Sequence, residues 1–203
     1  MRKTKIKKFS LAALCMGVLG CLTAGIYMQD LPMPFGVRAD AQDVSVDAHA
    51  GIPAENFYIY STGIRLVNDK NGTGLRFQTR INKTTYDELQ KSNSVSKTGT
   101  LILPEILYNN NLTLDNTSAL NIDTTDLWTL TEDETELYSI AYVYDIPVAN
   151  YGSKLLATSY VAYTDGTVKY TAISPATSMM DVAKTAPAEK AEQVAPYLVE
   201  NVT

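Results

Sequence analysis

The alternation of side chains from Leu75 to Ile81 is the feature that most limits how this 203-residue chain can fold. One parity holds Leu75, Phe77, Thr79 and Ile81, and the other holds Arg76, Gln78 and Arg80. Successive side chains of a β-strand point to opposite faces, so the pattern predicts a strand with one buried face. The preceding segment 57–67 is rich in aromatic and β-branched residues, and 68–74 is dense in Asn, Asp and Gly. The two segments are therefore predicted to form a β-hairpin.

Further strand-like segments follow this hairpin. They are expected at 100–106, 137–146, 155–163 and 167–173. Asp165-Gly166 is a strong turn signal and should join the last two as a second hairpin. The stretch 108–126 is heavy in Asn, Asp and Thr, so it is expected to be mostly loop, with a short strand at 112–114.

Helices are expected only at the flanks of these strands. Thr85 and Glu88 have capping-box spacing, which predicts a short helix ending near Ser92. Ser178 and Asp181 have the same spacing and predict a second short helix.

The final segment is Ala- and Glu-rich from 187 to 200, so a helical C-terminal end is expected. No regular β-α-β alternation is present along the chain. The predicted fold class is therefore α+β: a single domain at residues 56–203 with a mostly antiparallel β-sheet and short flanking helices.

The first 41 residues resemble an export signal. Basic residues at 2–8 precede an apolar run from Phe9 to Met28, and Ala39-Asp40-Ala41 supplies small residues for a signal peptidase. Three fates stay open: cleavage after Ala41, lipidation at Cys21, or retention as an anchor, because an apolar run of about 20 residues is near the length of a membrane span. All three predict a secreted or cell-surface protein, with membrane contact only through this leader.

Residues 42–203 carry a net charge of −9, because the leader removes a net +4 from the chain's −5. Nucleic acids and anionic membranes bind arrays of Lys and Arg, so nucleic acid is not an expected partner. Residues 42–55 combine Ala, Asp and Val with Gly51 and Pro53, and they are expected to be a linker.

Several kinds of chemistry are disfavoured by what residues 42–203 lack. Both cysteines, Cys15 and Cys21, lie in the leader, and the chain's histidine, His49, lies in the expected linker. Thiol chemistry, disulfides, His or Cys zinc sites and Ser-His-Asp triads are therefore not expected. The sequence has no P-loop, GxGxxG or GxSxG motif, so no cofactor is expected. The acidic residues of 123–136 lack calcium-loop spacing, and no metal is expected there.

The three arginines of residues 42–203 all lie in the first predicted hairpin. Arg65, Arg76 and Arg80, together with Gln78, are the candidate ligand-binding residues. Like charges across a strand pair repel, so something acidic must offset them. Arginine is well suited to bidentate capture of carboxylate, sulfate or phosphate. Two interpretations stay open: ion pairs with carboxylates of the domain, or a site for an anion or acidic glycan.

Three tyrosines, Tyr138, Tyr142 and Tyr144, share one parity of a predicted strand. Tyrosine rings can stack on sugars while their hydroxyls stay hydrogen-bonded. Ile140 and Ile146 have the same parity, which favours packing in the core over a ligand platform.

An ordered set of short motifs resembles a domain that recurs in secreted and surface proteins of clostridia-like gut bacteria of the Firmicutes. The motifs are Gly63-Ile64-Arg65, Gly74-Leu75-Arg76-Phe77, Gly99-Thr100-Leu101-Ile102-Leu103-Pro104, Ile146-Pro147-Val148-Ala149-Asn150-Tyr151 and Ser178-Met179-Met180-Asp181-Val182-Ala183. The resemblance spans residues 57–184. It implies a surface module of uncharacterised function without a mapped catalytic residue.

These observations favour an exported non-catalytic module that binds an extracellular glycan, a cell-wall polymer or a surface protein. One alternative is a carboxylate-dependent glycan hydrolase, which needs two acidic side chains about 5 to 10 Å apart across a cleft. The other alternative is a structural spacer of the cell envelope.

Overall fold

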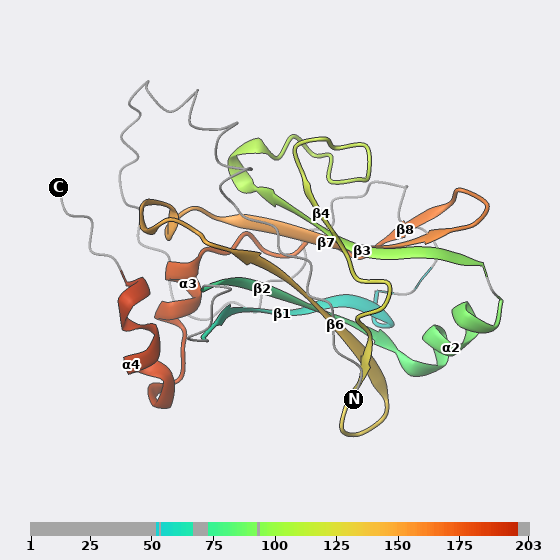
Figure 1. The fold of residues 1–203 in the computed structure, drawn as a ribbon, viewed down its shortest axis with the longest axis horizontal. Helices are drawn as coiled ribbons and strands as arrows, with labels where there is room; N and C mark the ends of the chain where they lie inside the picture. The colour runs from blue at the N-terminus through green and yellow to red at the C-terminus, as the bar shows by residue number, and fades with distance from the viewer. Residues whose placement is uncertain (1–51, 53, 67–72, 93, 199–203) are drawn as a thin grey trace.

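Two antiparallel β-sheets pack face to face in the computed structural model, which describes residues 52, 54–66, 73–92 and 94–198. The predicted leader lies outside the described residues, as do nearly all of the predicted linker and the turn at 67–72. Figure 1 shows one sheet above the other, with the short helices at the two ends. The α+β class with antiparallel pairing is therefore confirmed, but the strands form two sheets where one was expected.

The first sheet has the strand order β1-β2-β6-β5. Its strands are β1 (Phe57–Arg65), β2 (Gly74–Asn82), β6 (Glu136–Tyr144) and β5 (Thr129–Leu130). The predicted hairpin is present, with Ile64 paired to Leu75, and β1 has a bulge between Ile59 and Ser61.

The second sheet has the strand order β4-β3-β7-β8. Its strands are β4 (Leu120–Asp123), β3 (Val95–Pro104), β7 (Leu155–Tyr163) and β8 (Val168–Tyr170). The turn predicted at Asp165-Gly166 joins β7 to β8, and Gly166 has a φ of +87°, a conformation that glycine adopts without steric cost.

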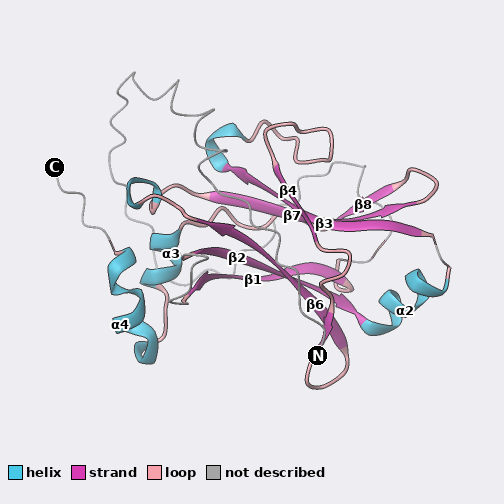
Figure 2. Cartoon of the chain, viewed as in Figure 1, coloured by secondary structure: helices cyan, strands magenta, loops and turns pink. Residues whose placement is uncertain are grey.

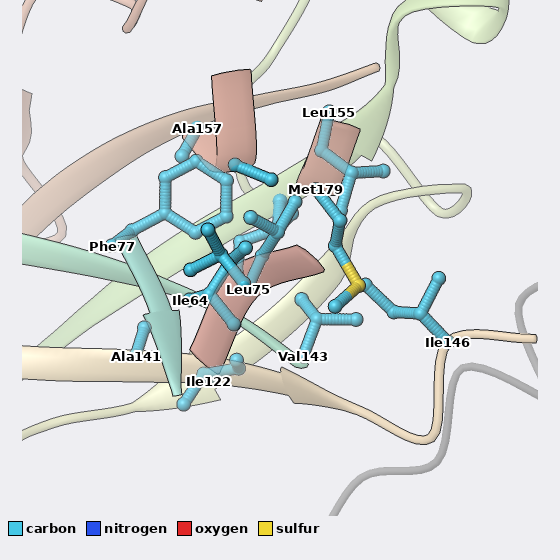
Figure 3. Packing of buried hydrophobic residues seen from close by; sticks show 13 residues of the cluster. Ile64, Leu75, Phe77, Ile122, Ala141, Val143, Ile146, Leu155, Ala157 and Met179 are labelled. Carbon is cyan, nitrogen blue, oxygen red and sulfur yellow. The ribbon is translucent and has the colours of Figure 1, made fainter. Parts of the chain in front are cut away.

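The main core fills the space between the sheets (Figure 3). Leu75, Phe77 and Val143 of the first sheet meet Ile102 and Ala157 of the second. A buried hydroxyl chain also links the sheets, because Thr79 Oγ1 lies 2.6 Å from Ser159 Oγ, which lies 2.8 Å from Thr100 Oγ1. These hydrogen bonds offset the cost of burying polar groups between two apolar layers.

The helices cap the ends of the two sheets (Figure 2). The α-helices are α2 (Lys83–Lys91), α3 (Met179–Lys184) and α4 (Ala191–Val194). The 3₁₀ turns are η2 (Glu105–Leu107), η3 (Val148–Asn150), η4 (Ala188–Lys190) and η5 (Ala195–Tyr197). None of the helices in the described ranges has the length and apolar content that a membrane span needs.

One of the two predicted caps is confirmed. Ser178 and Asp181 form a capping box at the start of α3. The box predicted from Thr85 is wrong, because the N-cap of α2 is Asn82, whose side chain accepts hydrogen bonds from the backbone N–H groups of Thr84 and Thr85. The helix therefore starts directly at the end of β2.

The loop before β4 contains a second correction. The short strand expected at 112–114 lies instead at Leu120–Asp123, where it pairs with β3. Leu112 is buried as a loop side chain against Leu103 and Tyr160 of the second sheet. Its apolar character therefore reflects packing on the outside of that sheet rather than a strand.

Candidate binding face on the outer side of the first sheet

The four candidate residues predicted from the sequence all lie on the outer face of the first sheet. Leu75 and Phe77 of β2 point into the core, so the alternate positions of β2 point outward. Because β2 lies between β1 and β6, each outward residue of β2 has one neighbour on each side. The four rows are Arg65–Gly74–Tyr144, Gly63–Arg76–Tyr142, Ser61–Gln78–Ile140 and Tyr58–Arg80–Tyr138.

This face is polar and aromatic rather than apolar. No member of the four rows belongs to any of the three apolar clusters in the described part of the chain. Arg65, Arg76, Gln78 and Arg80 are all half-buried, and Tyr60, at the β1 bulge, is 51% exposed. Such a surface combines charged donors with flat rings, the two groups that acidic sugars and other ring-containing anions require.

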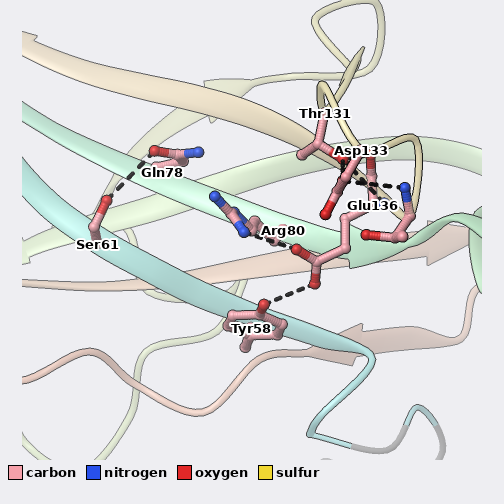
Figure 4. A network of polar contacts seen from close by, with 8 residues as sticks. Tyr58, Ser61, Gln78, Arg80, Thr131, Asp133 and Glu136 are labelled. Carbon is pink, nitrogen blue, oxygen red and sulfur yellow. Dashed lines mark hydrogen bonds and ion pairs between the residues drawn. The ribbon is translucent and has the colours of Figure 1, made fainter.

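The charge of Arg80 is paired with a carboxylate of the domain (Figure 4), although its buried Nε, like that of Arg76, has no hydrogen-bond partner in the described residues. Its Nη1 donates to Glu136 Oε2 at 2.8 Å, and Tyr58 Oη donates to Glu136 Oε1 at 2.7 Å. The guanidinium also lies over the ring of Tyr60, with Cζ 3.5 Å from the ring centroid. Burial, and then the hydrogen bond to Glu136, raise the pKa of Tyr58. For Arg80, the ion-pair interpretation is therefore the structural one.

Arg76 differs from Arg80 because no carboxylate of the described residues pairs with it. Its Nε is buried and has no hydrogen-bond partner in the described residues. The side chain lies across Gly63, since a Cβ added to Gly63 would be only 2.6 Å from that Nε. The glycine thus makes the space in which the guanidinium rests, and the guanidinium keeps donors for an external acceptor.

Arg65 and the two tyrosines beside it form a stacked group. The rings of Tyr142 and Tyr144 are 5.4 Å apart between centroids and are inclined by 16°. The Cζ of Arg65 lies 5.4 Å from the Tyr144 centroid and 5.9 Å from that of Tyr142. Such cation–π contacts hold the guanidinium against the two rings.

The expectation of packing in the core is wrong for Tyr138 and Tyr142, which lie half-buried on the outer face, whereas Tyr144 is only 2% exposed and is buried as expected, on the outer side of the sheet. The parity argument used Ile140 and Ile146. Ile140 is half-buried on the outer face opposite Gln78, and β6 ends at Tyr144, after which Asp145 has a left-handed φ of 55°. That residue breaks the alternation, so Ile146 enters the core while the tyrosines of the same parity face outward.

Gln78 connects the two ends of the face. It lies between Arg76 and Arg80 on β2, and its Oε1 accepts a 3.4 Å hydrogen bond from Ser61 Oγ. Since a strand rises about 3.4 Å per residue, Arg76 and Arg80 are about 14 Å apart along β2. The face is thus long enough for an extended polymer rather than a single small anion.

Other predicted features fall outside this face. Glu132, Asp133 and Glu134 are exposed, and Asp133 accepts hydrogen bonds from the Thr131 hydroxyl and the Thr135 N–H. These two bonds are the main reason that the pKa of Asp133 is lowered. Within the described ranges, no group of three or more His, Cys, Asp or Glu side chains is arranged to hold a metal ion.

No family model, curated protein or solved structure matches this chain. The resemblance to a recurring clostridial surface domain therefore stays a prediction.

Proposed function

We propose that this protein is an exported, non-catalytic module that binds an acidic glycan or cell-wall polymer on the outer face of its first sheet. The signal-like leader supports export to the outside of the cell. The resemblance of its short motifs to a recurring surface domain of clostridia-like bacteria favours the same location. A binding role needs only this face, whereas a spacer would need no such set of side chains.

The observation that carries the proposal is the state of Arg76. Among the described residues no carboxylate pairs with this guanidinium, in contrast to Arg80, so its charge and its Nη donors are available to an acidic group of a ligand. Arg65 lies one row away, at a strand rise of about 7 Å for two residues, and adds a second positive charge. Tyr142, beside Arg76, offers a ring on which a sugar can stack.

The carboxylates near this face favour binding over hydrolysis. Glycoside hydrolysis requires one carboxyl group as acid and a second as base or nucleophile. Both carboxylate oxygens of Glu136 already accept hydrogen bonds, from Tyr58 and Arg80, so Glu136 is poorly placed to act as an acid or a base. The adjoining cleft between β1 and α3 is lined by a single carboxylate, Asp181, which caps α3.

The test is a titration of the purified 203-residue chain with three decasaccharides: oligogalacturonate, hyaluronan and neutral maltodecaose. We expect the acidic sugars to bind saturably and more weakly as salt is added. The variant Arg65→Ala/Arg76→Ala should lose at least about tenfold in affinity, since charged hydrogen bonds contribute about 1.5 to 3 kcal/mol each.

A matched control separates the site from general charge. Lys154→Ala/Lys169→Ala removes the same two charges next to β7 and on β8 of the second sheet, and it should leave the affinity almost unchanged. Equal losses of glycan affinity in both double variants would show that binding depends only on net charge, and would contradict a site at Arg65 and Arg76. Binding of an acidic surface protein, but of no glycan, would replace the polymer by a protein partner.

A further inference from the structure

A cleft of about 390 Å³ adjoins the binding face at the free side of β1. It lies between β1 and the segment that leads into α3, which packs against β1. Its walls are formed by residues 59–62 of β1 and by side chains of the segment 174–185, including Thr177, Asp181 and Thr185. The volume is within the range of about 300 to 1,000 Å³ that is typical of small-ligand sites.

The lining predicts the chemistry of the occupant. Six of the lining residues carry hydroxyl groups, and the one charged residue is Asp181. The hydroxyls of Thr177 and Thr185 donate to backbone carbonyls at 3.1 Å, so their oxygens can still accept hydrogen bonds. A carboxylate repels an acidic group, whereas hydroxyl acceptors and Asp181 attract the O–H donors of an uncharged sugar.

Tyr60 links this cleft to the binding face. The β-bulge between Ile59 and Ser61 interrupts the alternation of β1 at this residue, and bulges commonly re-aim a side chain. Tyr60 lines the cleft, and Arg80 lies over its ring at 3.5 Å from the centroid. One ring therefore borders both the cleft and the arginine-bearing face.

We propose that the cleft is a subsite for a neutral sugar of the same polymer whose acidic groups bind at Arg65 and Arg76. This inference rests on the proposed function. It specifies the ligand as a mixed polymer, in which an uncharged sugar lies beside the part of β1 that pairs with Phe77, Gln78 and Thr79, about 3 to 10 Å along β2 from Arg76. A polymer with an acid on every residue would place a charge against Asp181.

The experiment compares the same decasaccharides on variants of the cleft. Hyaluronan alternates acidic and neutral sugars, whereas oligogalacturonate is acidic throughout. Tyr60→Ala should weaken hyaluronan binding about tenfold, because a sugar loses its stacking ring, and should change oligogalacturonate binding less than about twofold. Tyr60→Phe keeps the ring and should retain most of the affinity.

A second variant avoids the contact between Tyr60 and Arg80. Thr185→Val removes an exposed hydroxyl at the end of α3 without changing the side-chain shape, and it should weaken hyaluronan binding about threefold. Hyaluronan affinity within twofold of the parent in both Tyr60→Ala and Thr185→Val would overturn the subsite. Binding of oligogalacturonate without hyaluronan would also overturn it, and it would leave the proposed function standing.

The opposite failures are equally distinct. If maltodecaose binds, Tyr60→Ala abolishes that binding and no acidic sugar binds, the cleft is a sugar site and the acidic-polymer function is wrong. If none of the three decasaccharides binds, both proposals fail together.

Discussion

On the outer face of each sheet, a strand glycine makes room for a large side chain of the neighbouring strand, but the two side chains have different surroundings. On the first sheet, Gly63 pairs with Arg76, whose side chain lies over the glycine. On the second sheet, Gly99 pairs with Tyr160, and a Cβ on Gly99 would lie 2.5 to 2.7 Å from the Tyr160 ring and hydroxyl. In both cases a strand glycine makes space for a large side chain on the neighbouring strand.

The surroundings of the two large side chains differ. Tyr160 is fully buried under the loop that carries Leu112, and its hydroxyl donates to Asn121 Oδ1 at 3.0 Å. Arg76 is half-buried, and its Nε has no partner in the described part of the chain. The difference indicates that one face stabilises the fold, whereas the other keeps unmet hydrogen-bonding capacity, as a binding surface does.

The comparison is tested most strongly by truncating each large side chain. Tyr160→Ala should lower the free energy of unfolding by about 3 to 5 kcal/mol, because it leaves a cavity in a closed cluster. Arg76→Ala should change it by less than about 1 kcal/mol. Urea denaturation monitored by circular dichroism measures both. Similar losses for the two variants would show that both faces are structural.

Alanine at each glycine is the next test. In Gly99→Ala the new methyl meets an enclosed ring, so a loss of about 1 to 3 kcal/mol is expected. In Gly63→Ala it meets the flexible end of Arg76, so the loss of stability should stay below about 1 kcal/mol. Gly63→Ala should instead weaken acidic-glycan binding, because it displaces Arg76. Unchanged binding in this variant would mean that the position of Arg76 does not matter.

Glu136→Gln sharpens the comparison within the first sheet. Glutamine keeps the shape but removes the charge that neutralises Arg80, so the fold should lose about 1 kcal/mol. Acidic-glycan affinity should rise about twofold to fivefold, because the positive charge of Arg80 is no longer neutralised by Glu136. Isothermal titration at low and moderate salt measures the change. A fall in affinity would instead make Glu136 part of the ligand contact.

Local patterns predicted the hairpin and the shared face of its arginines. The period-2 alternation around Phe77 is contained in one segment, and the pairing of Ile64 with Leu75 follows from a single turn. The different states of Arg76 and Arg80 could not be predicted in this way. Glu136 reaches Arg80 from 56 positions away, and that distance depends on the pairing of β2 with β6.

The same limit explains the other errors. Division into two sheets depends on long-range pairing, such as that of β3 with β7, which periodicity does not encode. Packing of Tyr138 and Tyr142 in the core was predicted because Ile140 and Ile146 share their parity, but Asp145 breaks the alternation before Ile146. A short polar residue at a strand end tolerates a left-handed conformation, so Asp145 was the available signal.

Alkaline pH provides the smallest and most local test of the two faces. Burial is the main cause that raises the pKa of Tyr160, and Asp123 adds to it, while the hydrogen bond to Asn121 lowers it. Since the raised pKa favours the neutral ring in the folded state, its contribution is complete below about pH 10, the value of an unfolded tyrosine. It is then lost as pH rises through the folded pKa. Tyr160→Phe should therefore lose less stability than the parent in paired urea titrations between pH 9 and pH 11, about one unit on either side of the pKa of an unfolded tyrosine. Identical pH profiles would show that this buried hydroxyl does not control the alkaline stability of the second sheet.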